Sequence, residues 1–264
     1  MRSKAWGAVV AAVIAAVMLV SCDGFFSANV FKSAGLGQVS SSEIKTANTA
    51  ALYSDAYTSS GTVSASFLSA VTSDEETKTA VISTLTADES SSDPTTSQQA
   101  AVLKADIQLQ TTAAAETVSN LAGYLASATS LPSTSSDIAA FFKAVVPTDV
   151  QTDSTKLSAM VSALLTSAAD YTVVEKSLEA GSSNATLGKS TYATVLQSAA
   201  VSIIMTKVTV GGSPATADQI CTAIKSGDSS SLAFPTVDDI NSSLSGLLSA
   251  GGYTSISALL GSSK

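Results

Sequence analysis

The chain has 264 residues and a formal net charge of −8, because 21 acidic side chains outnumber 13 basic ones, and it contains no histidine. Its only arginine is Arg2, so the basic patches and guanidinium forks that bind phosphates are missing, which argues against nucleic acid as a partner. Without histidine the chain also lacks the usual general base and the imidazole metal ligand, and we expect no catalytic residues, no metal and no cofactor.

The first 22 residues have three parts. Arg2 and Lys4 give a positive start, residues 5–20 are apolar apart from small side chains, and Ser21 precedes Cys22. A helix that crosses a bilayer needs about 20 apolar residues, and this run is shorter. The segment therefore predicts a cleavable export signal.

The stretch Leu19-Val20-Ser21-Cys22 resembles the lipobox of bacterial lipoprotein precursors, in which a dedicated signal peptidase cuts directly before the cysteine. The resemblance covers only the first 22 residues. It implies cleavage between Ser21 and Cys22, a diacylglycerol on the Cys22 sulfur, and acylation of the new amino terminus by a fatty acid such as palmitate. The alternative is an ordinary export signal or membrane anchor in which Cys22 has no role.

Cleavage before Cys22 leaves 11 basic and 21 acidic residues, a net charge of −10. An acidic surface does not favour adhesion to anionic lipid heads, so lipid on Cys22 is the expected attachment to the membrane. We divide the chain into a cleaved signal (1–21), a flexible lipidated tether (22–39) and a single all-helical domain (40–264). The expected location is the bacterial cell envelope, with the domain facing the periplasm or the cell surface.

Helical spacing of apolar residues begins at residue 40. A capping box formed by Ser40 and Glu43 predicts the start of a helix that ends by residues 59–61. Residues 63–71 predict a second helical stretch. Ser73 and Glu76 match another capping box, which predicts a short helix through residue 85.

The longest helix is expected after residue 93, with Asp93 as the N-cap and Pro94 at the first helical position. Its apolar seam continues to Leu125. Residues 137–146 predict a short apolar helix. Residues 157–178 then show the clearest amphipathic pattern in the chain.

Residues 192–210 are open to two interpretations. The spacing up to residue 199 is helical, whereas residues 201–210 are rich in β-branched side chains and compatible with a strand. We favour a buried helix, because no second strand-like run is present for pairing.

Cys221 lies with Ala217, Ile220 and Ile224 at helical spacing, which predicts a buried thiol that acts as a small hydrophobe. Without a histidine as a neighbouring base, a reactive thiol is not expected. A helix capped at Thr236 should carry the leucines up to residue 248, and a last helical turn is expected at residues 256–260.

One internal similarity connects residues 162–172 with residues 245–254. Both begin with a small residue pair followed by two leucines, and both reach a Tyr-Thr pair at nearly the same distance. This similarity is compatible with a helical repeat that shares a helix-turn signature. Chance matches are also frequent in a chain so rich in Ser, Ala and Leu.

Three patterns are candidates for chemistry. Ser42-Glu43-Ile44-Lys45 has the Ser-x-x-Lys spacing of penicillin-recognising acyl enzymes, but the companion motifs are missing and we favour a chance match. Paired carboxylates at 74–76, 88–89 and 238–239 are placed at helix starts, where acids complement the dipole, rather than in a hydrolase or calcium site. Tyr53 and Tyr57, one turn apart, are interpreted as half-buried core edge rather than as a ligand groove.

These patterns predict an all-α fold, either a multi-helix bundle or a loosely repeating helical stack behind the tether. The leading function is a non-catalytic, lipid-anchored envelope protein that presents its helical domain to a protein partner or serves a structural role. The alternative is a lipid- or small-molecule-binding accessory module of a transport system, which would use the apolar interior around residues 201–205. A hydrolase using Ser with Asp or Lys is the least favoured class.

Overall fold

The computed structural model describes residues 40–57, 63–127, 135–181, 184–228, 230–256 and 258. Helices dominate this part of the chain and each of its three strands has two residues, so the predicted all-α class is confirmed. The helices are α2 (Ser41–Thr46), α3 (Thr49–Ala56), α4 (Ala65–Val71), α5 (Glu75–Asp88), α6 (Pro94–Gln110), α7 (Ala114–Ser127), α8 (Ser135–Val145), α9 (Thr148–Thr152), α10 (Ser154–Glu179), α11 (Lys189–Lys207), α12 (Ala217–Ser226), α13 (Val237–Ser243) and α14 (Ser245–Gly251). The strands are β1 (Thr209–Val210), β2 (Ser213–Pro214) and β3 (Leu232–Ala233).

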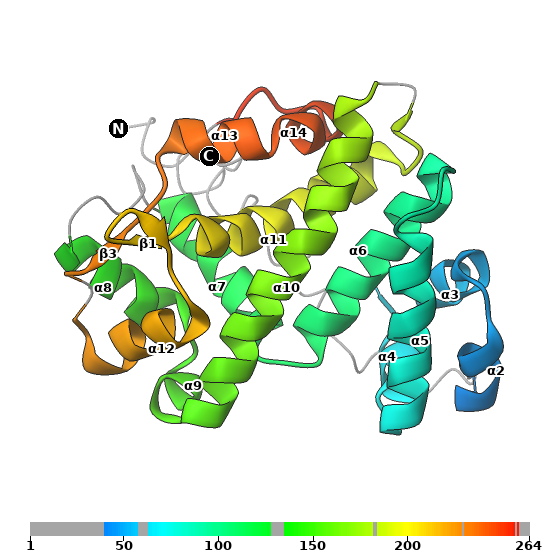
Figure 1. Cartoon of the computed structure of the whole chain (residues 1–264), viewed down its shortest axis with the longest axis horizontal. Helices are drawn as coiled ribbons and strands as arrows, with labels where there is room; N and C mark the ends of the chain where they lie inside the picture. The colour runs from blue at the N-terminus through cyan, green and yellow to red at the C-terminus, as the bar shows by residue number, and fades with distance from the viewer. Residues whose placement is uncertain are drawn as a thin grey trace, which may run out of the picture.

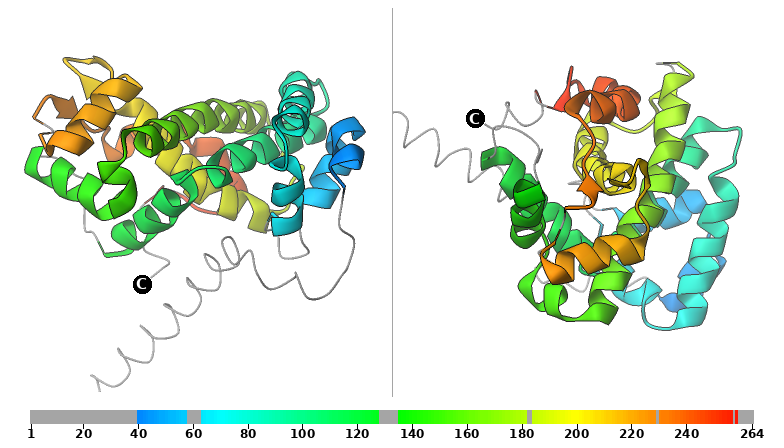
Figure 2. Two further views of the ribbon diagram at one scale, coloured as in Figure 1. Left: turned by 90° about the horizontal axis from the view of Figure 1, so that it is seen from below. Right: turned by 60° about the vertical axis from the view of Figure 1, so that its left-hand side comes forward.

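Helices α6 and α10 form the centre of the fold and pack against each other more extensively than any other pair. In Figure 1, α10 crosses the middle of the molecule with α6 beside it. Helices α2–α5, which we call the N-terminal layer, lie on the far side of α6 (Figures 1 and 2). On its other sides α10 contacts α7, α9, α11, α12 and α14.

Two apolar clusters meet at α6. The smaller cluster belongs to the N-terminal layer and includes Ala100, Leu103 and Ile107 from α6. The larger cluster fills the space among α6–α14 and receives Ala105 and Leu109, among others, from the same helix. Helix α6 is therefore buried on both sides, and it connects the N-terminal layer to the rest of the fold.

Helix α10 is long and apolar enough to cross a membrane, by length and composition only, and it is the only helix of the described residues that meets this test. Half of its most apolar window, 50%, is buried inside the fold. A core helix of a soluble domain has the same properties, so its packing against six other helices accounts for its composition.

The prediction of one continuous helix that starts at residue 40 and ends by residues 59–61 is wrong, because the structure has two helices there. The Ser40–Glu43 capping box is confirmed, but α2 ends at Thr46. Asn48 then caps α3, because its side-chain oxygen accepts a hydrogen bond from the Ala51 amide at 2.9 Å. An asparagine that bonds to its own backbone competes with helix continuation, and here it starts a new helix.

The long helix predicted from Pro94 to Leu125 is also wrong, although its start at Asp93 and Pro94 is confirmed. The chain leaves helical geometry at residues 111–113 and restarts as α7. The Thr112 hydroxyl accepts a hydrogen bond from the Ala114 amide at 3.2 Å, which satisfies a free donor at the start of α7. Helix α10, with 26 residues, is the longest helix of the described chain.

Helix α5 begins one residue later than predicted. Asp74, not Ser73, is its N-cap and accepts a hydrogen bond from the Thr77 amide at 2.7 Å. The Ser73 hydroxyl instead donates to the Ala70 carbonyl of the preceding turn. Aspartate is at least as good a cap as serine, so the better-placed acceptor takes the position.

The favoured helix over residues 192–210 is confirmed as far as Lys207, where α11 ends, but it is wrong for residues 209–210, which form strand β1. The expectation that no strand is available for pairing is wrong. Strand β1 pairs antiparallel with both β2 and β3, with Val210 opposite Ser213 and Leu232. Gly211 and Gly212 have φ values of 57° and 83°, which produces the tight two-residue turn between β1 and β2.

The predicted helix after Thr236 divides into α13 and α14, although its capping box is confirmed. The similarity between residues 162–172 and 245–254, which the sequence left open between a repeat and a chance match, does not correspond to a shared helix-turn structure. Residues 162–172 lie inside the continuous helix α10, whereas α14 ends at Gly251 and Gly252 adopts a left-handed conformation. Most of the expected turn at 256–260 lies outside the described residues.

Candidate functional site

The residues predicted to carry the function, Leu19, Val20, Ser21 and Cys22, lie outside the described residues, as does the tether at 22–39. The lipobox therefore stays a prediction from sequence. Inside the helical domain, the candidate site consists of buried polar side chains on α6 and α10.

A buried ion cluster joins α5, α6 and α10. Lys104 Nζ lies 2.6 Å from Glu89 Oε2 and 2.9 Å from Asp170 Oδ1. The three side chains are 10%, 11% and 3% exposed, so all are largely removed from water. Glu89 Oε1 and Asp170 Oδ2 are buried without a hydrogen-bond partner. Two carboxylates and one ammonium leave the cluster with an excess negative charge when all are ionised.

Burial and neighbouring groups change the pKa values in this cluster. Burial raises the pKa of Asp170 to about 7; the hydrogen bond from Lys104 opposes this rise, and the Glu89 carboxylate adds to it. Burial lowers the pKa of Lys104, but its bonds to Glu89 and Asp170 outweigh that effect, and the net shift is upward. Lys104 therefore stays charged while Asp170 takes up a proton near neutral pH.

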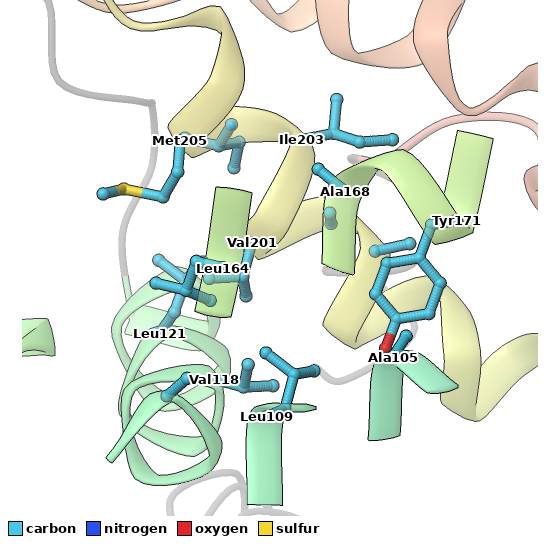
Figure 3. Packing of buried hydrophobic residues seen from close by; sticks show 14 of the residues in the cluster. Ala105, Leu109, Val118, Leu121, Leu164, Ala168, Tyr171, Val201, Ile203 and Met205 are labelled. Atoms are coloured by element: carbon cyan, nitrogen blue, oxygen red, sulfur yellow. The ribbon is translucent and has the colours of Figure 1, made fainter. Parts of the chain in front are cut away.

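A second buried carboxyl group, Asp106, lies two residues further along α6. The Tyr57 hydroxyl donates to Asp106 Oδ2 at 2.5 Å, and Asp106 is 4% exposed. Burial raises the pKa of Asp106 to about 7, and the hydroxyls of Tyr57 and Tyr171 offset part of the rise. Figure 3 shows Tyr171 on α10 with its hydroxyl directed toward α6 near Ala105.

The tyrosine prediction is confirmed and extended. Tyr53 and Tyr57 are partly buried against the core, with ring centroids 4.4 Å apart. Tyr57 also connects the N-terminal layer to α6 through its bond to Asp106. The pair is therefore part of the helix packing.

Gln98 forms a second polar contact between α6 and α10. Its amide nitrogen donates to Ser177 Oγ at 2.8 Å and to the Asn184 carbonyl at 2.6 Å. Its amide oxygen accepts a hydrogen bond from the Tyr192 hydroxyl at 2.5 Å. Gln98 is fully buried, so these bonds satisfy groups that would otherwise destabilise the core.

Glu175 on α10 binds the start of α14. Its carboxylate accepts hydrogen bonds from the amides of Gly246 at 2.6 Å and Leu247 at 2.9 Å, and from the Ser245 hydroxyl at 3.2 Å. A carboxylate at a helix N-terminus complements both the free amides and the dipole. A Cβ on Gly246 would lie 2.8 Å from Leu178 Cβ, so glycine is required for this close approach.

The prediction that the paired carboxylates lie at helix starts is confirmed for two of the groups and wrong for the third. Residues 74–76 and 238–239 lie at the starts of α5 and α13. Asp88 and Glu89 instead lie at the end of α5, where the dipole disfavours acids. Hydrogen bonds compensate: Asp88 accepts from the Thr49 hydroxyl at 2.5 Å, and Glu89 binds Lys104.

The remaining candidates for chemistry are not assembled into a site. Lys45 pairs with Glu76 at 2.5 Å, whereas Ser42 Oγ lies 3.0 Å from Ser40 Oγ. Cys221 packs against the larger apolar cluster, as predicted for a small hydrophobe, but it is only partly buried. The buried face of α12 is carried by Ile220 and Ala223, and Cys221 lies beside it. Burial raises the pKa of the Cys221 thiol above its ordinary value, which favours the protonated, less nucleophilic form.

An apolar cavity of about 10 Å³ lies among α7, α8, α10 and α11. Leu121, Leu164, Val201 and Met205 are among its lining residues, and Figure 3 shows these side chains packed together. This volume corresponds to about one water molecule, so in this conformation the cavity does not accommodate a lipid or a small organic ligand.

Among the described residues, no group of three His, Cys, Asp or Glu side chains could hold a metal ion.

The four buried charged residues Lys104, Asp106, Asp170 and Glu175 were not predicted from the sequence. The signal that could have identified them is a charged residue next to apolar residues of a predicted helix, on α6 or α10. Charged side chains are rarely buried unless they are paired. A lone charge in an apolar seam therefore predicts a buried partner, but the seam does not identify that partner.

The fold belongs to the broad class of all-α, multi-helix proteins. No family model matches the chain, and no curated protein or solved structure matches it either.

Proposed function

We propose that this chain is a non-catalytic, lipid-anchored protein of the bacterial cell envelope, which presents its helical domain to a protein partner or serves a structural role. The observation that carries the proposal is the Leu19-Val20-Ser21-Cys22 stretch after a positively charged, apolar leader. Two or three acyl chains, each methylene contributing about 0.8 kcal/mol, hold such a domain at a membrane almost permanently.

The helical domain supports a role without catalysis. Its buried ionisable groups, Lys104, Asp106, Asp170 and Glu175, bind one another or the backbone between packed helices. They face neighbouring elements of the same chain, so they act as structural contacts. The alternative, a lipid- or small-molecule-binding accessory module of a transport system, has less support because the cavity around Val201 and Met205 holds about one water molecule.

Fatty-acid labelling of the full chain in a bacterial host tests the anchor. The two cysteines provide a matched pair of variants, Cys22→Ala and Cys221→Ala. We expect the wild-type chain and Cys221→Ala to incorporate a labelled fatty acid and to migrate as the cleaved form. Cys22→Ala should lose the label and keep its leader. Label retained by Cys22→Ala, or absent from the wild-type chain, would contradict the proposal.

A further inference from the structure

The junction between the N-terminal layer and the α6–α10 pair contains several buried or partly buried ionisable groups. The layer provides Glu89 at the end of α5, and Tyr53 and Tyr57 from α3 and its C-cap. Helix α6 provides Lys104 and Asp106. Helix α10 contributes Asp170 and Tyr171, and Tyr192 of α11 acts electrostatically on Tyr53.

The charges at this junction do not balance when every carboxyl group is ionised. Glu89, Asp106 and Asp170 would carry three negative charges against the single positive charge of Lys104. Tyr53, Tyr57, Tyr171 and Tyr192 stay neutral, because burial raises the pKa of each. An uncompensated charge in a protein interior is costly, so the folded junction favours bound protons.

The hydrogen bonds show where protons fit. Glu89 Oε1 and Asp170 Oδ2 are both buried without a partner, although each residue's other oxygen binds Lys104. The Glu89 carboxylate also contributes to the raised pKa of Asp170. Protonation of Asp170 turns one of its carboxyl oxygens into a hydrogen-bond donor. At Asp106, protonation removes the charge while Tyr57 keeps its bond to the carboxyl group.

The N-terminal layer is attached to the rest of the fold chiefly through α6, which α3 and α5 both contact. Its apolar attachment consists of Ala100, Leu103 and Ile107 on α6. The polar contacts Tyr57–Asp106 and Glu89–Lys104 lie at the same junction. A change in charge at these contacts therefore directly changes how strongly the N-terminal layer is attached to α6.

We propose that the Glu89–Lys104–Asp170 cluster and the Tyr57–Asp106 pair form a proton-dependent clasp, which holds the N-terminal layer closed when Asp106 and Asp170 are protonated and loosens it when these two groups ionise. The direction follows from linkage. The folded junction binds protons more tightly than solvated carboxyl groups do, so its contribution to closure is complete at acidic pH. Burial raises the pKa of both Asp106 and Asp170 to about 7, so this contribution is lost as the pH rises from about 4 to about 7.

Hydrogen exchange of the full chain in detergent, measured at pH 5.5 and pH 8.5, tests this proposal. Exchange is expressed as protection factors, which removes the dependence of intrinsic exchange on pH. In the wild-type chain we expect protection in α2–α5 to fall at least tenfold at the higher pH, relative to protection in α11. The double variant Asp106→Asn/Asp170→Asn should show no such difference between the layer and the core.

Three further variants keep the test decisive. Asp106→Asn and Asp170→Asn alone should each reduce the selective fall, so the proposal stays testable if the double variant does not fold. Glu175→Gln is the matched control, because Glu175 is a buried carboxylate on α10 that contacts α14 instead of the N-terminal layer. It should keep the full fall in α2–α5. A wild-type change spread evenly over all helices, or a selective fall that persists in the Asn variants, would overturn the proposal.

Discussion

Replacement of Asp106 by asparagine tests the account of the buried charges most simply. Asparagine has nearly the same shape and still accepts the Tyr57 hydroxyl, which lies 2.5 Å from Asp106 Oδ2. It cannot ionise, so the variant removes the titration and keeps the packing. We expect Asp106→Asn to be more stable than the wild-type chain at alkaline pH.

The magnitude follows from the pKa of Asp106, which burial raises from 3.8 to about 7. The folded state binds this proton more tightly than the unfolded chain, so the stabilisation is present below about pH 4 and is lost as pH rises toward 7. Each pH unit in this window removes about 1.4 kcal/mol, or about 4 kcal/mol in all. Relaxation and water entry around the ionised group reduce the expected loss to about 2–4 kcal/mol.

Urea unfolding followed by circular dichroism at pH 4, 6 and 8 gives the free energies of unfolding. The difference between Asp106→Asn and the wild-type chain should be near zero at pH 4 and reach about 2–4 kcal/mol at pH 8. The wild-type chain and the variant share all other ionisable groups, so the contributions of those groups to the free energy of unfolding cancel in this difference. Asp55→Asn, at an exposed position on α3, controls for the effect of an Asp-to-Asn substitution outside the core. A difference that does not depend on pH, or a variant less stable than wild type at pH 8, would refute the reasoning.

Two further predictions concern the contact between α10 and α14. Gly246→Ala places a Cβ 2.8 Å from Leu178 Cβ, so urea unfolding should show a loss of about 1–3 kcal/mol. Gly123→Ala, an exposed helical position where an added Cβ meets nothing within 4 Å, should instead gain about 0.5–1 kcal/mol, and similar losses for both would contradict the close approach. Glu175→Ala removes the acceptor for three donors at the start of α14 and should cost about 2–3 kcal/mol, with faster hydrogen exchange in α14. Unchanged exchange in that helix would show that the carboxylate does not hold it.

The presence of helices was predictable because the spacing of apolar residues and the capping residues are local properties of the sequence. The helix over residues 157–178 and the caps at Ser40, Asp93 and Thr236 are confirmed for this reason. The breaks were missed because they depend on which polar side chain bonds to the backbone. Thr112 could have continued the helix, and only its bond to the Ala114 amide shows that it does not.

The polar contacts between helices were not predictable, because their partners are far apart in the chain. Lys104 and Asp170 are separated by 66 positions, and no local pattern pairs them. The same limitation applies to Glu89, which local rules placed at a helix start and which lies at a helix end beside Lys104. Apolar periodicity predicts the face of a helix, but the packing angle determines which charges meet.

Mass spectrometry of the amino-terminal peptide, isolated with the full-length protein from membranes, tests the central claim most directly. The account predicts a peptide that begins at Cys22 and carries a diacylglyceryl group on the cysteine sulfur, with or without a further acyl chain on the new amino group. A peptide that retains Ser21, or that begins at Cys22 without lipid, would contradict the assignment of Leu19-Val20-Ser21-Cys22 as a lipoprotein processing site.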